Sequence, residues 1–405
     1  MVDKLLEQSA HVISLNLCLC QCKIECVRVI NYELTKKANS ATYLSLIFTM
    51  KSEPRRRKRN TPPRMVRALA AAQQIAFGPL AFQAVRAMLK CGMLEYLEQN
   101  QPATRKDLVV RYGRYMADVL TESGVTAGVL TEAEDGTLTL SDVGYCLLSD
   151  EMTRANFDFV ADVCYLGADK LWEALEESKP SGLKVFGDWP TIYEGLSRLP
   201  EPARTSWFTF DHLYSDAFFA QAIELMRANA SLENVFDVGG NTGKFAGCLL
   251  RAVEDANVTI VDLPGQLEMA RANMAWAGDR CRYAVANVLS DAPWPTGASV
   301  VWMSQFLDCF SHEQIVHILR KAAAVLVPGG SIFISEPFID CQTFDAAAYS
   351  LAQGSLYFTC MANGNSKFYT AAEMEECVRE AGLQVRQSWH SLGKYQYSLM
   401  QCVLA

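Results

Sequence analysis

The feature that most constrains the fold is an apolar segment that runs into a glycine-rich turn and then into a helical stretch. Residues 235–238 read Val-Phe-Asp-Val, the turn Gly-Gly-Asn-Thr-Gly occupies 239–243, and residues 244–253 have helical periodicity. A strand that ends in such a turn brings backbone N–H groups and a helix N-terminus to the carboxyl edge of a sheet, where open α/β sheets bind their ligands. Glycine adopts left-handed backbone freely, and asparagine tolerates it better than most residues.

Further short apolar runs follow, separated by helical stretches such as 311–326. These runs are 258–261, 300–303 and 331–334. Strands that alternate with helices predict a doubly wound, Rossmann-like parallel sheet. Near the end of the chain, 384–390 and 395–403 are two β-like runs joined by a short Leu-Gly-Lys link. We therefore expect the sheet to close with an antiparallel hairpin.

An acidic residue, Asp262, ends the second of these runs, 23 positions after Gly239. A carboxylate there is suitably placed to accept hydrogen bonds from two ribose hydroxyls, which implies a nucleoside-containing cofactor. Both NAD and S-adenosylmethionine contain a nucleoside with two ribose hydroxyls, so both fit this site. The turn lacks the second spaced glycine of the Gly-x-Gly-x-x-Gly fingerprint, which disfavours a nicotinamide-dependent oxidoreductase. A plain dinucleotide fold would also not need the terminal hairpin.

The first 165 residues lack this alternation of strands and helices, and their composition indicates two segments. Residues 1–64 combine an apolar, Cys-rich stretch with the basic run 55–59 and are expected to be a disordered or misassigned leader. Residues 65–165 have helical periodicity, with Thr104 as a helix cap and a hairpin after Asp135-Gly136, which is typical of a winged helix. We assign 166–405 to a helical connector, which leads to a helix over 207–227, and to the ligand-binding domain.

Charge argues against nucleic acid as a partner of this winged helix. Residues 65–150 hold seven Arg or Lys against ten Asp or Glu, and the whole chain carries a net charge of -8. Proteins that bind a phosphate backbone depend on basic side chains. A packing and dimerisation module is therefore the preferred interpretation, and a homodimer is expected.

Composition and cysteine usage favour a protein of the cytoplasm. The fourteen cysteines are scattered along 405 residues, unlike the short, Cys-dense chains that disulfides staple. Cys18, Cys20, Cys22 and Cys26 match no standard zinc spacing, so no metal is expected. No uncharged apolar run of about 18 residues appears, so no membrane partner is expected either.

At this point residues 70–405 resemble the class I methyltransferases, and within them the two-domain small-molecule O-methyltransferases that include the plant caffeate enzymes and acetylserotonin methyltransferase. Three segments carry the resemblance, with support from Pro328-Gly329-Gly330 and the run to Glu336: Asp237–Gly243, Val261-Asp262-Leu263-Pro264 and Phe306–Gln314. The resemblance implies S-adenosylmethionine as cofactor, an N-terminal winged helix that builds a homodimer, and a sheet that ends in a hairpin.

Carried over by position, the resemblance implies roles for individual residues. Gly239 lines the methionine part of the cofactor, Asp262 holds the ribose and Leu263 lies beside the adenine. Two positions depart from the family: Asn287 stands where an Asp is usual, and Ser304 where the plant enzymes have a Lys. The expected cofactor-binding residues are Asp237, Gly239, Gly240, Asn241, Gly243, Asp262, Leu263, Asn287, Val288 and Ser304.

The larger departure concerns the catalytic base. The plant enzymes use a His followed by Asp-Trp, whereas the matching residues here are Asp308, Cys309 and Phe310. Glu336 matches one of the acidic residues that orient the family's His, and Phe368 stands in place of the second. Three alternatives stay open: Asp308 is the base, His212 supplies it, or positioning alone suffices.

We therefore predict an O-methyltransferase whose acceptor is a hydroxyl, expected to be phenolic, on a small aromatic or secondary metabolite. Aromatic residues such as Trp207 and Phe210 would be core in most proteins, but a pocket for a planar phenol also needs a few of them. The competing hypotheses are a non-catalytic or regulatory relative that keeps the fold and a nicotinamide-dependent oxidoreductase.

Overall fold

The structure is a computed structural model that describes residues 63–216 and 218–405. Contacts divide the chain into two units, residues 1–76 and 77–405. The predicted leader, 1–64, lies outside the described residues except for its last two positions. The predicted boundaries after residues 64 and 165 stay predictions.

The N-terminal part is helical with one small antiparallel sheet, as expected. Thr104 caps α6 in a capping box with Asp107, and the hairpin after Asp135 is present. The strands are arranged in the order β1-β3-β2. The elements are α4 (Arg64–Lys90), α5 (Met93–Asn100), β1 (Ala103–Thr104), α6 (Arg105–Tyr112), α7 (Arg114–Thr126), β2 (Leu130–Glu132), β3 (Thr137–Leu140), α8 (Asp142–Ser149) and α9 (Glu151–Phe159).

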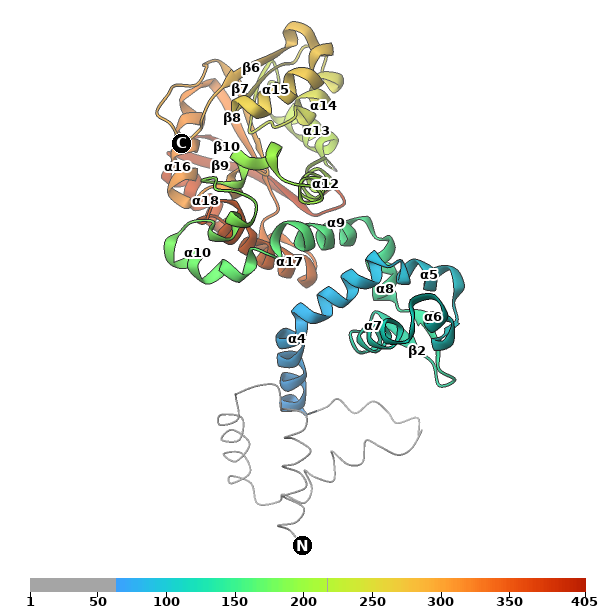
Figure 1. Ribbon diagram of the computed structural model, residues 1–405. Helices are drawn as coiled ribbons and strands as arrows, with labels where there is room; N and C mark the ends of the chain where they lie inside the picture. Colours follow the sequence, from blue (N-terminus) through green and yellow to red (C-terminus); the bar gives the residue numbers. More distant parts are fainter. Residues whose placement is uncertain (1–62, 217) are drawn as a thin grey trace, which may run out of the picture. The chain divides into compact units, whose positions relative to one another are not determined.

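A seven-stranded mixed sheet forms the centre of the C-terminal part (Figure 1). Its strand order is β6-β5-β4-β7-β8-β10-β9, with β10 antiparallel to β8 and β9 and the other neighbours parallel. The predicted parallel sheet with a terminal hairpin is therefore confirmed. The strands are β4 (Asn234–Val238), β5 (Asn257–Asp262), β6 (Cys281–Val285), β7 (Ala298–Ser304), β8 (Leu326–Glu336), β9 (Leu383–Leu392) and β10 (Tyr397–Leu404).

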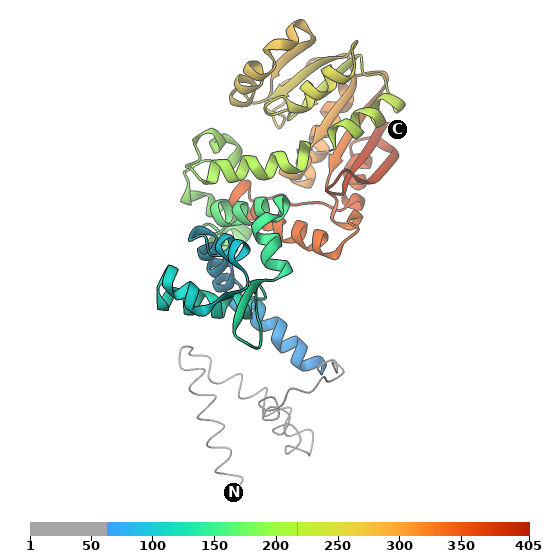
Figure 2. The same ribbon diagram turned by 90° about the vertical axis from the view of Figure 1, so that its right-hand side faces the viewer.

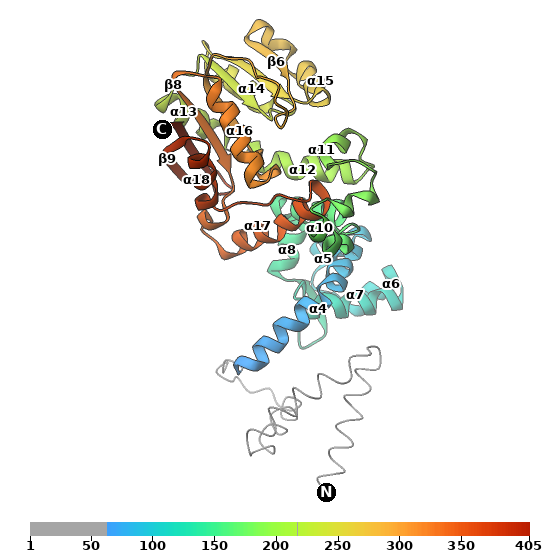
Figure 3. The ribbon, with the colours of Figure 1, turned by 90° about the vertical axis from the view of Figure 1, so that its left-hand side faces the viewer.

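Helices cover both faces of this sheet (Figure 3). On one face Trp302 of β7 stacks on Phe245 of α14, with ring centroids 4.2 Å apart. On the other, Met303 packs in the cluster that holds Ile318 of α16. Alternate residues of one strand thus face opposite helical layers, as a doubly wound sheet requires. The helices are α13 (Phe219–Asn229), α14 (Lys244–Ala252) and α15 (Pro264–Asn273) on one face, and α16 (His312–Ala324) and α18 (Ala371–Glu380) on the other.

One predicted helix is wrong in its extent. The sequence predicts a single helix over 207–227, whereas the structure has α12 (Ala203–Asp216) and, separately, α13 from Phe219. Phe218 stacks on Tyr397 of the sheet, with centroids 4.9 Å apart, while Trp207 belongs to a different buried cluster. The two helices therefore pack against different parts of the fold.

The connector helices lie beside the helical segment after β8 (Figure 2), and their side chains form a further buried cluster. Phe159 stacks on Phe210 at 4.1 Å and meets Tyr357 edge to face, which joins residues almost 200 positions apart. This cluster supplies one wall of the cavity described below. Its elements are α10 (Leu171–Glu177), α11 (Ile192–Gly195), α12 and α17 (Asp345–Tyr357).

Helix α4 is the one described helix that is long and apolar enough to cross a membrane by length and composition. Its most apolar window has a mean hydropathy of 1.2, and 6% of that window is buried. Residues 68–85 of this helix carry no charged side chain, although Gln73, Gln74 and Gln83 interrupt the apolar run. Its apolar surface needs a cover, whether lipid or protein.

Candidate functional site

A cavity of about 530 Å³ opens at the carboxyl ends of β4, β5 and β7. This is the edge at which the order of the strands reverses, between β4 and β7, and where ligands bind in open α/β sheets. One half of the cavity is lined by the turns after these strands. The other half is lined by aromatic side chains of the connector and of α17. We call them the turn half and the helix half.

The glycine-rich turn has the backbone that its sequence predicts. Gly239 has φ 74° and Asn241 has φ 47°, so both lie in the left-handed region. A Cβ on Gly239 would come within 2.2 Å of the Phe306 ring. Gly243, at φ 81°, begins α14 and does not line the cavity; it shapes the turn instead.

Asp262 ends β5 and lines the turn half. Its two carboxylate oxygens accept backbone N–H groups of Asn241 at 2.8 Å and Leu263 at 2.7 Å. Burial raises the pKa of this carboxyl, and the two hydrogen bonds oppose that rise. Each oxygen keeps a second lone pair, so a fixed carboxylate remains able to accept two ligand hydroxyls.

Four buried polar atoms that belong to lining residues of the turn half have no hydrogen-bond partner in the described part of the chain: Asp237 Oδ2, Asn241 Oδ1, Ser304 Oγ and Gln305 Oε1. Unpartnered buried groups are costly, so such a cluster points to a polar ligand. Burial, then the charge of Asp262, raises the pKa of Asp237 to about 7. A cationic ligand group fits this acidic end, whereas a pyrophosphate does not.

The remaining expected cofactor residues lie along one rim of the turn half. Leu263, Asn287 and Val288 all line it. Lys321 of α16 fixes this rim, because its Nζ donates to the carbonyl oxygens of Val288 and Ser290 at 3.4 and 2.5 Å. The loop that would contact an adenine is therefore tied to the helical layer beneath it.

Asp308 lies at the junction of the two halves, on the turn 307–309 (Leu307–Cys309), and only 4% of it is exposed. Burial raises its pKa to about 7. Glu336, at the end of β8, accepts the backbone N–H groups of Phe306 and Leu307 at 3.1 and 2.9 Å through one oxygen. Burial and the nearby Asp308 raise the pKa of Glu336 well above its usual value. Glu336 itself does not line the cavity, so it supports the turn from behind.

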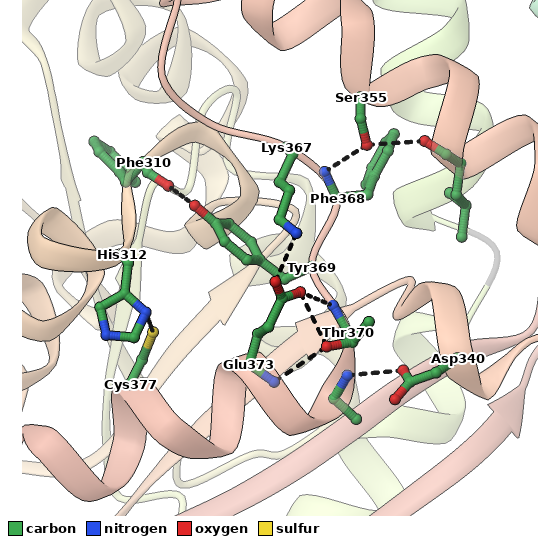
Figure 4. Close-up of polar contacts among 12 residues, drawn as sticks. Phe310, His312, Asp340, Ser355, Lys367, Phe368, Tyr369, Thr370, Glu373 and Cys377 are labelled. Atoms are coloured by element: carbon green, nitrogen blue, oxygen red, sulfur yellow. Dashed lines mark hydrogen bonds and ion pairs between the residues drawn. The ribbon is translucent and has the colours of Figure 1, made fainter.

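Two further hydrogen bonds hold this turn from the side of the helix half. Asn363 Nδ2 donates to the Cys309 carbonyl at 2.8 Å, and the Tyr369 hydroxyl donates to the Phe310 carbonyl at 2.6 Å (Figure 4). The neighbouring Phe368, which stands where the family has an acidic residue, is buried and lines the cavity. Asp308 is thus preorganised by backbone contacts rather than by a second carboxylate at position 368.

His212 lies on α12 in the helix half, and about a quarter of its side chain is exposed. Its Nδ1 is 3.9 Å from Asp211 Oδ2, and its ring stacks on Phe208 at 6.0 Å. It also lines an outer groove with Lys394. The structure therefore brings Asp308 and Glu336 together and places His212 on the connector wall of the same cavity.

Gln305, Tyr193 and Asn363 are among the lining residues that sequence reasoning missed. Gln305 has a left-handed backbone, with φ 45°, directly after β7, so its position at a strand end was a usable signal. Tyr193 and Asn363 line the helix half from a single-turn helix and from the segment after α17. Neither segment has a periodicity that points to the cavity.

Comparison with known proteins agrees with this geometry. Residues 211–384 match the model of the O-methyltransferase domain, and residues 70–136 match that of the Dimerisation2-like domain. The L-tyrosine C(3)-methyltransferase of Streptomyces lavendulae is 25% identical over 316 residues, 76% of this chain and 85% of that protein. The 3-hydroxy-5-methyl-1-naphthoate 3-O-methyltransferase of Streptomyces sahachiroi is 26% identical over 319 residues, 76% of this chain and 87% of that protein.

Among solved structures, the S-adenosylmethionine-dependent methyltransferase SibL in its apo form matches with a TM-score of 0.63 and 26% identity. The match covers 83% of this chain and 99% of that one. The two domain matches and the similarity to this solved structure thus agree with the fold described above. The chain belongs to the S-adenosylmethionine-dependent O-methyltransferases that carry an N-terminal dimerisation-type domain.

Proposed function

We propose that the chain transfers a methyl group from S-adenosylmethionine to a phenolic hydroxyl of a small aromatic metabolite. The observation that carries this proposal is the position of Asp308. It is a buried carboxyl at the junction of a turn half with unpartnered polar atoms and a helix half rich in aromatic rings. Acceptor and cofactor in the two halves would meet beside it.

In the turn half, the chain's own residues bind and orient the cofactor. Gly239 lines the methionine part, where no larger residue fits beside Phe306. The Asp262 carboxylate, fixed by two backbone N–H groups, receives the ribose hydroxyls. Leu263, Asn287 and Val288 flank the adenine, and Asp237, Asn241 and Ser304 offer polar atoms to the amino-acid end.

In the helix half, the lining favours a planar and uncharged acceptor. The aromatic walls bury flat apolar surface and leave few polar contacts. Lys244, beside the glycine-rich turn, is the one Lys or Arg that lines the cavity within residues 63–216 and 218–405, whereas Asp211 and Glu194 line the helix half. We expect phenols without a carboxylate to be preferred. The aromatic residues of this wall are Phe159, Tyr193, Trp207, Phe210, Tyr357, Phe358 and Phe368.

Asp308 accepts the acceptor's proton in this proposal. When bound, S-adenosylmethionine supplies an electrophilic methyl group on a good leaving group. Asp308, with its pKa raised by burial, is a better base towards a phenol than an ordinary aspartate, whose pKa is about 3.9. Glu336 positions the Asp308 turn, and His212 lines the acceptor's entrance. Alignment of acceptor oxygen and methyl carbon supplies the rest of the acceleration.

A second candidate is methylation of a ring carbon next to the hydroxyl. The relative from Streptomyces lavendulae is named for C(3) of tyrosine. Removal of a phenol's proton makes its oxygen and its ortho carbon nucleophilic together, and methylation at carbon then also releases the ring proton to restore the aromatic ring. Which atom lies closer to the methyl group then decides the product.

The experiment is a transfer assay against a panel of phenols, catechols and naphthols with S-adenosylmethionine, read by mass spectrometry and proton NMR. We expect one methyl ether and one S-adenosylhomocysteine per turnover. A methylated ring carbon would support the second candidate. No transfer and no calorimetric binding of S-adenosylmethionine would contradict the proposed function.

We further propose a cytoplasmic homodimer whose interface includes α4 and α7. Ile75 and Phe77 of α4 are 81% and 59% exposed, and Tyr115 of α7 is 83% exposed. The Dimerisation2-like match spans these helices, which favours a second copy over lipid as their cover. Cysteines of the described residues such as Cys91, Cys146 and Cys341 are free thiols, in agreement with a reducing compartment. Light scattering should give twice the chain mass, and flotation with liposomes would support the membrane alternative.

A further inference from the structure

Beyond Asp308, the helix half holds a second polar group that faces the acceptor position. Tyr193 lies on the single-turn helix α11, and its buried hydroxyl has no nitrogen or oxygen partner in the described residues; its one hydrogen-bonding neighbour is the Cys309 thiol. The other tyrosine that lines the cavity, Tyr357, has a nitrogen partner, because its hydroxyl accepts a hydrogen bond from Trp207 Nε1 at 2.7 Å. A buried phenolic O–H whose one partner is a thiol, a weak acceptor, gains free energy when a ligand oxygen accepts its proton.

The neighbours of this hydroxyl connect it to the proposed base. It lies beside the thiol of Cys309. That thiol in turn donates to Asp308 Oδ1 at 3.4 Å. The tyrosine hydroxyl and the carboxyl of Asp308 therefore flank the same thiol on the cavity wall. A ligand oxygen that lies next to this thiol would meet a donor and an acceptor together.

The position of Tyr193 is fixed by packing on both sides. Ile192 and Leu196, which flank its turn, are buried in the connector cluster. Gly195 lets the Trp189 ring approach α11, because a Cβ there would come within 2.1 Å of that ring. Arg198 covers the same ring, with its guanidinium carbon 4.9 Å from the ring centroid. A side chain held in this way is a preorganised donor rather than one recruited on binding.

We propose that the Tyr193 hydroxyl is a catalytic hydrogen-bond donor to the acceptor oxygen. This inference rests on the proposed function. The acceptor's O–H bond breaks towards Asp308 while its oxygen bonds to the methyl carbon, and the electrons of the sulfur–methyl bond return to sulfur. Tyr193 keeps its proton throughout and stabilises negative charge on the oxygen as the acceptor's proton leaves.

The electrostatics of the two groups suit this division of roles. Burial, with the nearby Cys309 and Asp308, raises the pKa of Tyr193 well above its usual value of 10. It therefore remains a neutral donor at any working pH and does not compete with Asp308 as base. Donors aimed at developing negative charge in a water-poor site are among the largest contributors to catalysis.

The test uses Tyr193→Phe in the full chain, which removes one oxygen and keeps the ring. We expect kcat to fall about 10- to 100-fold, with unchanged calorimetric affinity for S-adenosylmethionine. The melting temperature should change little, since only a weak contact with the Cys309 thiol is lost. A structural role would give the opposite result, a lower melting temperature with unchanged kcat.

Tyr397→Phe is the matched control. Its hydroxyl is also buried and unpartnered, but it does not line the cavity. We expect its kcat to stay within about twofold of wild type. An equal loss in both variants would overturn the proposal.

A series of para-substituted phenols gives a second readout. The Tyr193→Phe defect should be largest for weakly acidic phenols and smallest for 4-nitrophenol, whose anion needs the least stabilisation. A defect independent of the phenol's acidity, or none, would overturn the inference and leave the proposed function standing. A wild-type chain that methylates no phenol would instead contradict the proposed function, and the inference with it.

Discussion

The turn half and the helix half of the cavity are built in different ways. The turn half is made of backbone and strand ends: the Gly239 turn, the end of β5 and the end of β7 lie within one sheet. The helix half is made of side chains from α9, α11, α12 and the segment after α17. A site made of backbone depends on few residue identities, whereas one made of packed side chains changes with every helix face.

This difference separates the cofactor site, which many enzymes share, from the acceptor site, which differs between them. A cofactor shared by many enzymes is met by the half that tolerates little variation, since a Cβ on Gly239 would strike Phe306. The acceptor is met by the half in which Tyr193, Phe210 and Phe368 belong to separate segments. Asp308 lies where the halves join, so its removal should separate binding from chemistry most clearly.

The largest expected effect is that of Asp308→Asn. We expect kcat on the true acceptor to fall by about 10²–10⁴, because a positioned general base contributes on that scale. The affinity for S-adenosylmethionine, measured by calorimetry, should stay within about threefold, because Asp308 serves the acceptor. An equal loss of kcat and of cofactor affinity would show that Asp308 serves cofactor binding as well as chemistry.

The stability of the ligand-free chain should depend on pH because of Asp237, the buried carboxyl of the turn half. An unfolded Asp loses its proton near pH 3.9, whereas burial holds the pKa of Asp237 at about 7 in the fold. Between these values the folded state binds the extra proton, so stability decreases as pH rises from 4 to 7. The loss is on the order of 2–4 kcal/mol.

Urea denaturation of the ligand-free chain at pH 5 and pH 8 measures this loss. Asp237→Asn should remove the share of Asp237 from this dependence, leave the share of Asp308 and Glu336, and make the chain more stable at pH 8. A stability that rises over this interval would contradict the pKa assigned to Asp237.

Asp262→Ala comes next in size. It removes a carboxylate that two backbone N–H groups hold in place. We expect calorimetric binding of S-adenosylmethionine to weaken by about 1.5–3 kcal/mol, the scale of hydrogen bonds to a charged group. Unchanged affinity would remove Asp262 from the cofactor site.

The smallest effect is expected for His212→Ala. The ring lies on the connector wall with a quarter of its side chain exposed, so we expect kcat to fall less than about fivefold. KM for the acceptor should change more than kcat. The reverse ranking, with His212→Ala nearly inactive and Asp308→Asn near wild type, would transfer the role of base to His212.

The sequence predicted the turn half far better than the helix half, for a physical reason. A glycine-rich turn and an acidic strand end are local patterns, and the left-handed Asn241 follows from its residue type. The position of Tyr193 depends on how a single-turn helix packs against Trp189 and on its distance from Cys309, which no local period encodes. The break between α12 and α13 was missed for the same reason, since it depends on Phe218 meeting Tyr397.

The most direct test of the account is the pH dependence of kcat for wild type and Asp308→Asn with one productive phenol. Because burial raises the pKa of Asp308, wild-type kcat should rise with pH through a single midpoint near neutrality. In Asp308→Asn this midpoint should disappear, and the remaining rate should rise only towards the pKa of the free phenol. The same neutral midpoint in both proteins would contradict the account, because the titrating base would then be another group.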